Sequence, residues 1–250
     1  MKPGVAAVAG GAAALAVVNA APSVTAIGPV RTRFAPSLAG IDSGPGATVA
    51  LTFDDGPDPA HTPAVLQALA DAGVHATFFV LASMVARSPS LARELVAAGH
   101  EVGLHGWDHR CALLELPGRT SRRLAKARDV VADVVGVRPR HYRPPYGILS
   151  AQAWRVARSL GMRTVLWSAS GLEWRPGSTA ATVLANVRRD LRPGATILLH
   201  DSDCTSPPGS AGAAVAALPG LIAECASRGL TLGSLDDRGS PLPTARRWGP

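Results

Sequence analysis

Short apolar runs alternate with longer segments of helical periodicity along most of the chain. Such runs, rich in Val, Leu, Ile and Thr, are typical of buried strands, whereas apolar residues repeated every third or fourth position are typical of helices packed on a sheet. We predict strands at residues 48–53, 76–81, 101–104, 141–143, 164–167, 196–199 and 230–232. Predicted helices lie between them, at residues 62–72, 90–98, 121–135, 151–159, 179–190 and 213–227.

This alternation of strand and helix predicts parallel βα units in an α/β fold, either a barrel or a doubly wound sheet. The sequence has 250 residues, of which 47% are hydrophobic and 17% charged, so it is not a disordered chain and it suits one large domain. Three cysteines without a Cys-x-x-Cys pair exclude a disulfide scaffold and a cysteine zinc finger.

The formal net charge of +7 is weak evidence for nucleic-acid binding. Lysine occurs only at Lys2 and Lys126, so arginines spread along the chain carry almost all of the positive charge. The densest basic stretch, residues 119–128, has Leu124 and Ala125 at helical spacing and lacks aromatic residues for base stacking. This pattern favours a solvated helix face, and we expect no nucleic-acid partner.

The N-terminus has the pattern of an export signal. Lys2 precedes an apolar run over residues 5–18, and small residues near Ala20 suit a cleavage site. We therefore expect residues 1–26 to be a leader, the protein to be secreted or associated with the cell envelope, and no stable membrane span to remain after processing. A cytoplasmic protein with an apolar leader is the alternative.

The other boundaries follow from composition. Residues 27–46 are rich in proline and glycine and are predicted to be a linker that can pack on the domain. Residues 47–237 are predicted to form one folded domain, and residues 238–250 an unstructured tail. We expect a monomer.

Polar residues cluster where the predicted strands end. Asp54 and Asp55 follow the first strand and precede a Gly-Pro turn, so they are candidates for a reaction site, although such a pair can also cap a turn. His105 and His109 follow the third strand four residues apart. On a helix this spacing would place both imidazoles on one face, within reach of one metal ion.

Two further strands end in the same way. The fourth ends at Arg143, which is followed by Pro144, Pro145 and Tyr146, and the sixth ends just before His200. In a βα barrel the carboxyl ends of all strands face the same rim, where such enzymes have their active sites. Polar residues at four strand ends therefore favour a functional site over turn capping.

On these residues the chain resembles the polysaccharide deacetylases with a NodB homology domain, carbohydrate esterase family 4. Thr-Phe-Asp-Asp-Gly-Pro at 52–57, His-x-x-x-His at 105–109, Arg-x-Pro-Tyr at 143–146 and Leu-x-His at 198–200 occur in the family's order. The resemblance covers about residues 47–235 and implies a distorted (β/α)7-type barrel in a single domain. It also implies the removal of N-acetyl groups from glycans that contain N-acetylhexosamine, such as chitooligosaccharides or peptidoglycan.

The resemblance also implies roles for individual residues. Asp55, His105 and His109 would bind a divalent metal, most often zinc in this family, which activates water and polarises the acetyl carbonyl. Asp54 would be the general base, and Arg143 would keep Asp54 ionised and oriented.

The other residues of the site are implied in the same way. The backbone N–H of Tyr146 would help to hold the oxyanion. His200 would protonate the leaving amine, and Trp174 and Leu198 would form the acetyl pocket. The expected partner is therefore an acetylated glycan.

The sequence departs from the family pattern at two places. Gly106 stands where the family has Ser or Thr after its first motif histidine, which affects loop support more than metal binding. Ser170 and Glu173 replace the two aspartates of an Asp-x-x-Asp-Trp motif, the first of which orients or tunes the catalytic histidine. We expect Glu173 to brace the loop that carries Trp174 rather than to support the charge of His200.

Two other functions remain open at this stage. Hydrolysis of O-acetyl esters on a plant polysaccharide uses the same motifs, and a decayed fold could serve as a non-catalytic carbohydrate-binding module. The presence of all three metal ligands together with Asp54 and His200 favours an active enzyme.

The cysteines allow one structural hypothesis. Cys111 and Cys204 follow strand ends at the same predicted rim, so an exported protein could join them in a disulfide, with three reduced cysteines as the alternative. Cys225, within an apolar helix, is expected to be a buried free thiol.

Overall fold

The computed structural model describes residues 14–42, 44 and 48–238 of the chain. Its strands are β1 (Val49–Asp54), β2 (Thr77–Leu81), β3 (Glu101–Gly106), β4 (His141–Tyr142), β5 (Arg163–Thr164), β6 (Ala169–Ser170), β7 (Thr196–His200) and β8 (Leu232–Gly233). Within the described residues they form one eight-stranded parallel sheet in the order β5-β4-β3-β2-β1-β7-β6, with β8 paired to β1.

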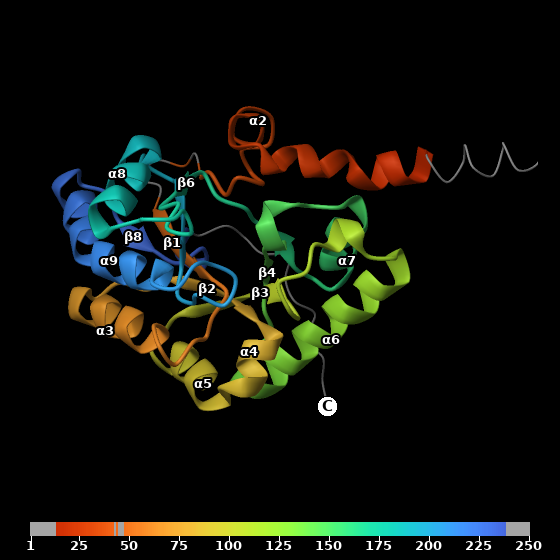
Figure 1. The fold of residues 1–250 in the computed structure, drawn as a ribbon, viewed down its shortest axis with the longest axis horizontal. Helices are drawn as coiled ribbons and strands as arrows, with labels where there is room; N and C mark the ends of the chain where they lie inside the picture. Colours follow the sequence, from red (N-terminus) through yellow and green to blue (C-terminus); the bar gives the residue numbers. More distant parts are fainter. Residues whose placement is uncertain (1–13, 43, 45–47, 239–250) are drawn as a thin grey trace, which may run out of the picture.

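Helices connect the strands and cover the outside of the curled sheet (Figure 1). They are α2 (Gly28–Phe34), α3 (Thr62–Ala72), α4 (Ala82–Arg87), α5 (Pro89–Ala97), α6 (Pro117–Val135), α7 (Ala151–Ser159), α8 (Ala180–Asp190) and α9 (Ser210–Ser227). Short 3-10 helices are η1 (Ala21–Ala26), η2 (Ala112–Leu114), η3 (Pro145–Gly147) and η4 (Asp236–Arg238). The core lies between sheet and helices, where Phe53 stacks on Phe78 with ring centroids 5.0 Å apart.

The predicted α/β architecture, a (β/α)7-type barrel in one domain, is confirmed. The bounds of α3 and α7 match the prediction, because both helices are amphipathic and follow clear strands. The prediction missed α4 and β6. Both are very short, so periodicity carries little signal for them, and β6 forms only because β7 lies beside it.

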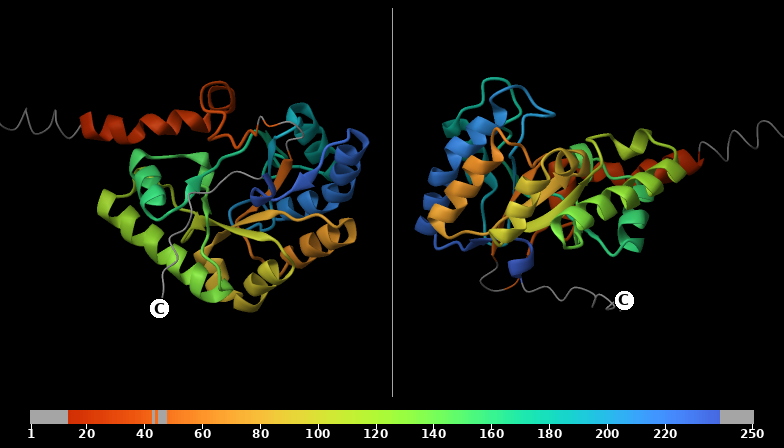
Figure 2. Two further views of the ribbon diagram at one scale, coloured as in Figure 1. Left: turned by 180° about the vertical axis from the view of Figure 1, so that it is seen from behind. Right: turned by 90° about the horizontal axis from the view of Figure 1, so that it is seen from below.

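The barrel is open on one side. In the described chain β5 and β6 are the two ends of the strand order and do not pair with each other. The N-terminal segment lies along this opening, as the views from both sides show (Figures 1 and 2). The N–H of Leu166 donates to the Leu38 carbonyl at 2.7 Å, and the Thr196 hydroxyl donates to the Gly40 carbonyl at 2.7 Å. Two carbonyls of the segment therefore attach it to β7 and to the residues after β5.

This attachment refines the expected boundaries. The predicted linker at residues 27–46 contains helix α2, which packs on the domain. At the other end, Arg238 donates to the Thr48 carbonyl at 3.0 Å, so it belongs with the domain rather than with the predicted tail. Residues 1–13 and 239–250 lie outside the described residues. They include the start of the predicted leader and all of the predicted tail beyond Arg238.

Among the described residues, α9 is the one helix whose length and hydropathy would suit a membrane span, which the sequence pattern had not singled out. It packs against α3, α8 and β7, and Leu218 and Leu221 are buried there. A buried core helix meets the same criteria of length and composition.

The three cysteines are free, so the hypothesis of a disulfide between Cys111 and Cys204 is wrong. The loop after β7 folds toward the end of β1 instead, and the Cys204 thiol lies 3.8 Å from the carbonyl oxygen of Asp55. Cys225 is a buried free thiol, as the apolar helix around it predicted.

Candidate active site

A cavity of about 280 Å³ opens where the parallel strands end. Most of the predicted site residues line it: Asp54, His105, His109, Tyr146, Trp174, Leu198 and His200. The remaining two, Asp55 and Arg143, lie in contact with residues of this lining. Parallel pairing explains the convergence, because the register of β1 with β7 places Asp54 directly beside His200.

Arg143 orients Asp54. Its guanidinium is fully buried and donates from Nη1 to Asp54 Oδ1 at 2.7 Å and to the Thr52 hydroxyl at 2.8 Å. The guanidinium also lies 4.0 Å from the centre of the Phe79 ring. A charge-assisted bond between two buried groups holds the carboxylate in one orientation, which leaves Oδ2 directed toward His105, 3.7 Å from its Nε2.

Asp55, His105 and His109 form a candidate metal centre. Their ligand atoms lie within 4.8 Å of one another. Asp55 Oδ1 is 3.4 Å from His105 Nε2 and 3.6 Å from His109 Nε2, and within the described chain this buried oxygen has no hydrogen-bond partner. An unpartnered buried carboxylate oxygen facing two imidazole nitrogens is the donor set of a divalent transition metal such as zinc.

Protonation favours the same interpretation. Burial, opposed in part by Asp55, lowers the pKa of His105 to about 3. Burial also lowers the pKa of His109. The Nδ1 of His105 lies 2.8 Å from the Arg143 carbonyl, which assigns the proton to Nδ1 and leaves the Nε2 lone pair directed at Asp55. Both rings are therefore neutral at pH 7, the protonation state in which an imidazole can bind a metal ion.

The two histidines do not share a helix, contrary to the expectation from their spacing. His105 lies in β3, and His109 follows it in a bend. Gly106 between them has φ +111°, a conformation that residues with a side chain rarely adopt. This turn brings the two rings to a centroid distance of 5.0 Å, and it gives a physical reason for glycine where the family has Ser or Thr.

The loop after β7 holds Asp55 from the other side. The Thr205 hydroxyl donates to Asp55 Oδ2, and Asp201 accepts the N–H of Gly56 at 3.1 Å. Thr62 donates to the second oxygen of Asp201 at 2.6 Å. Sequence reasoning missed Thr205, because its loop has no motif. Asp201 follows His200 directly, and this position could have indicated that the loop after the strand contributes to the site.

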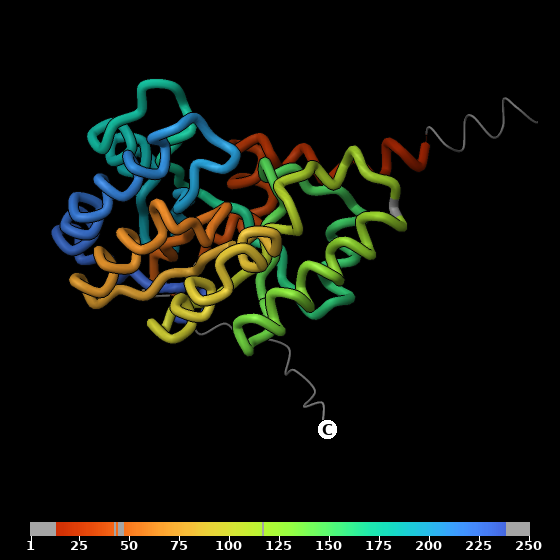
Figure 3. Tube along the Cα trace, turned by 60° about the horizontal axis from the view of Figure 1, so that its bottom comes forward, coloured from red at the N-terminus to blue at the C-terminus, as the bar shows by residue number. Residues whose placement is uncertain are grey.

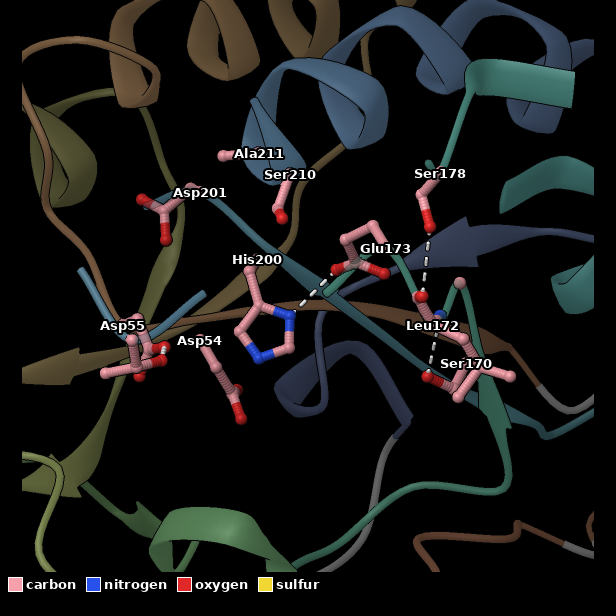
Figure 4. A network of polar contacts seen from close by, with 12 residues as sticks. Asp54, Asp55, Ser170, Leu172, Glu173, Ser178, His200, Asp201, Ser210 and Ala211 are labelled. Carbon is pink, nitrogen blue, oxygen red and sulfur yellow. Dashed lines mark hydrogen bonds and ion pairs between the residues drawn. The ribbon is translucent and has the colours of Figure 1, made fainter. Parts of the chain in front are cut away.

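Glu173 is the charged partner of His200, so the expectation that it braces the Trp174 loop instead was wrong. Glu173 is fully buried, and its Oε1 lies 2.8 Å from His200 Nδ1 (Figure 4). Burial lowers the pKa of His200, but the hydrogen bond and charge of Glu173, with smaller contributions from Asp55 and Asp54, outweigh it and raise the pKa to about 9. The Ser170 hydroxyl faces away from His200 and accepts a hydrogen bond from the Leu172 N–H at 3.3 Å.

Aromatic rings enclose the pocket. The Trp174 ring lies 5.2 Å from that of His200, and the Tyr146 ring 4.3 Å from that of His109. Trp167 also lines the pocket, and sequence reasoning did not identify it. It packs on Gly147, where a Cβ atom would lie 2.6 Å from the indole.

A second acidic and histidine cluster lies at the opposite end of the strands. Glu101 and His141 stand at the starts of β3 and β4, and Asp236 lies nearby. Their charges are already compensated: Glu101 pairs with His141 and accepts from the Thr77 hydroxyl at 2.7 Å, and Asp236 pairs with Arg140. The cluster is explained as an internal network.

We predict that Thr205→Val weakens metal binding by about 10–100-fold, because the Asp55 carboxylate loses the hydroxyl that orients it. Competition with a chelator of known affinity measures the effect. Ser206→Ala, in the same loop, is the control. Equal metal affinity in the Thr205 variant and wild type would show that the contact does not support the site.

We predict that Gly147→Ala destabilises the protein by about 2–5 kcal/mol, from the strain of φ +66° in a residue with a side chain and from the clash with Trp167. Gly161→Ala is the matched control, since its φ is +78° and no atom lies within 4 Å of the added Cβ. Denaturant unfolding compares the two. An equal loss in both variants would contradict the clash.

Comparison with known proteins agrees with this geometry. The family model described as polysaccharide deacetylase matches residues 42–165. A peptidoglycan-N-acetylglucosamine deacetylase of Listeria monocytogenes is 36% identical over 176 residues, which is 69% of this chain but 37% of the relative. A chitooligosaccharide deacetylase of Sinorhizobium fredii is 39% identical over 203 residues, 77% of this chain and 93% of the relative.

Solved structures show the same fold. The Bc1960 peptidoglycan N-acetylglucosamine deacetylase has a TM-score of 0.73 and 28% identity, covering 79% of this chain and 90% of its own. A family 4 carbohydrate esterase from Streptomyces lividans has a TM-score of 0.67 and 30% identity, covering 75% of this chain and 92% of its own. The motifs, the barrel and these relatives together establish that the chain belongs to the polysaccharide deacetylase family.

Proposed function

We propose that the protein is a metal-dependent hydrolase that removes N-acetyl groups from N-acetylhexosamine glycans of the peptidoglycan or chitooligosaccharide type. The observation that carries the proposal is one pocket holding the group Asp55, His105 and His109 beside a base candidate, Asp54, and an acid candidate, His200. The named deacetylases among the relatives support the substrate class. Zinc is the proposed metal, because two neutral imidazoles and one carboxylate suit it.

The residues of the site support catalysis. A carbohydrate esterase family 4 pseudoenzyme from Bacillus anthracis shares the fold with a TM-score of 0.70 at 23% identity, so the fold alone does not imply activity. Here the candidate ligands, base and acid are all present and converge on one cavity. We therefore favour an enzyme over a carbohydrate-binding module.

In the proposed mechanism, Asp54 and His200 divide the proton transfers. A divalent ion held by Asp55, His105 and His109 would supply Lewis acidity, which lowers the pKa of water and polarises the acetyl carbonyl. Asp54 accepts the proton of the attacking water on Oδ2, since Arg143 holds Oδ1. His200, kept protonated by Glu173, donates a proton to the amine nitrogen as the C–N bond breaks, and acetate and the free amine result.

The walls of the pocket orient the substrate. Leu198 and Trp174 offer an apolar surface to the acetyl methyl group. The backbone N–H of Tyr146 is the proposed donor to the developing oxyanion, and the left-handed conformation of Tyr146, φ +59°, belongs to the turn that presents it.

Export to the cell envelope is part of the same proposal. The apolar run at residues 5–18 supports it, as does a glycan substrate of the peptidoglycan type, which lies outside the cytoplasm. We also propose that the protein acts as a monomer, since one chain supplies every residue of the site.

We predict that His105→Ala and His109→Ala each abolish stoichiometric metal binding and lower acetate release from N-acetylated chitooligomers to the background rate. Elemental analysis and enzymatic acetate detection measure the two effects, and circular dichroism checks the fold. His75→Ala, an exposed histidine away from the pocket, is the control. Undiminished turnover by a metal-free variant would overturn the mechanism, and release from acetylated xylan alone would replace the amide substrate with an ester.

We predict that Glu173→Gln moves the alkaline limb of the kcat profile to lower pH by about 1–3 units. His200 must be protonated to act as the acid, and Glu173 raises the pKa of His200, so without that charge the imidazolium loses its proton at a lower pH. Glu115→Gln, which removes a charge outside the pocket, is the control. Because a bound cation also repels the imidazolium, the variants are compared at equal metal loading. An unchanged alkaline limb would show that Glu173 does not set the pKa of His200 during turnover.

A further inference from the structure

We propose that Arg31, on the N-terminal helix α2, is a positioning residue of the active site. It holds Trp167, which lines the catalytic pocket, so the segment at residues 28–41 contributes to the geometry of the active site. The match to the family model begins at residue 42, after this helix.

Two buried arginines satisfy three successive carbonyls at the open side of the barrel. These carbonyls belong to the segment that follows β5. Arg143 donates to the Val165 carbonyl at 3.2 Å and to the Leu166 carbonyl at 2.8 Å. Arg31 donates to the Trp167 carbonyl at 2.8 Å. In a closed barrel a neighbouring strand would provide these donors. The N-terminal segment therefore supplies one of these donors, through Arg31.

The environment of Arg31 shows that its position is specific. The side chain is 3% exposed, and Nη1 donates to the Thr25 carbonyl at 2.8 Å and to the Ala26 carbonyl at 3.3 Å. Within the described part of the chain, its hydrogen bonds go to carbonyl oxygens rather than to a carboxylate. Burial and the nearby charge of Arg143 lower its pKa to about 10, so the group stays charged at neutral pH. Burying a cation in this way is costly unless its contacts are well made.

Trp167 transmits this contact to the pocket. The guanidinium of Arg31 lies 4.5 Å from the centre of the indole, a cation–π distance, and α2 runs beside the segment that carries Trp167 (Figure 3). The indole also lines the cavity and packs on Gly147, in the turn next to Tyr146. Loss of Arg31 would release the indole and with it the turn that presents the proposed oxyanion donor.

The test compares Arg31→Met with Arg33→Met. Arg33 is an exposed arginine on the same helix, so its variant is the control. In protein labelled with 5-fluorotryptophan, Trp167→Phe assigns the fluorine NMR signal of Trp167. We expect Arg31→Met to shift or broaden that signal and to lower kcat about 10-fold or more at unchanged metal content, because small displacements at a reaction site have large rate effects. Arg33→Met should match wild type in both measurements.

A lower melting temperature with wild-type kcat, KM and fluorine signal would make Arg31 merely structural and overturn the proposal. If Arg31→Met does not fold, Arg31→Lys replaces it. Lysine keeps the charge, but it cannot stack flat on the indole while donating to the same three carbonyls. The same changes in the fluorine signal and in kcat are therefore expected, and their absence would contradict the proposal. The kinetic half rests on the proposed function. If wild type releases no acetate, that function fails, while the fluorine signal still decides whether Arg31 positions Trp167.

Discussion

The buried guanidinium of Arg143 is the interaction on which the rest of the site depends. Its side chain holds Asp54 and the carbonyls after β5, and its own carbonyl holds the ring of His105. One residue thus joins the general-base candidate, the metal-ligand candidate and the open edge of the sheet. Because the group is fully buried, each of its donors needs a partner, and that requirement determines how β1, β3 and the segment after β5 lie at the rim.

The neighbours of the three pocket histidines give these rings different protonation states. His200 sits on a buried carboxylate and is held as a cation, whereas His105 and His109, at a similar depth, are held neutral. Three imidazoles in one pocket therefore have two protonation states, which suit the two proposed roles of acid and metal ligand. The difference comes from Glu173, whose carboxylate bonds to His200, and from burial, which lowers the pKa of the other two rings.

The departures from the family pattern have local compensations. Glutamate at position 173 is longer than aspartate and reaches His200 directly, so Ser170 is free to cap the turn at Leu172. Glycine at position 106 permits the left-handed backbone between the two histidines. At the open side, Arg31 of helix α2 donates to the Trp167 carbonyl, and the carbonyl of Leu38, which follows α2, accepts the N–H of Leu166.

The sequence by itself determined the βα order, the bounds of helices such as α3 and α7, and the identity of the residues at the strand ends, because periodicity and parallel topology act along the chain and place those ends at one rim. Only the tertiary structure decided the partners of those residues. That Glu173 meets His200, that Thr205 meets Asp55 and that Arg31 meets Trp167 depends on loops and on an N-terminal helix without sequence periodicity. Their positions come from long-range burial and hydrogen bonding, which no local pattern encodes.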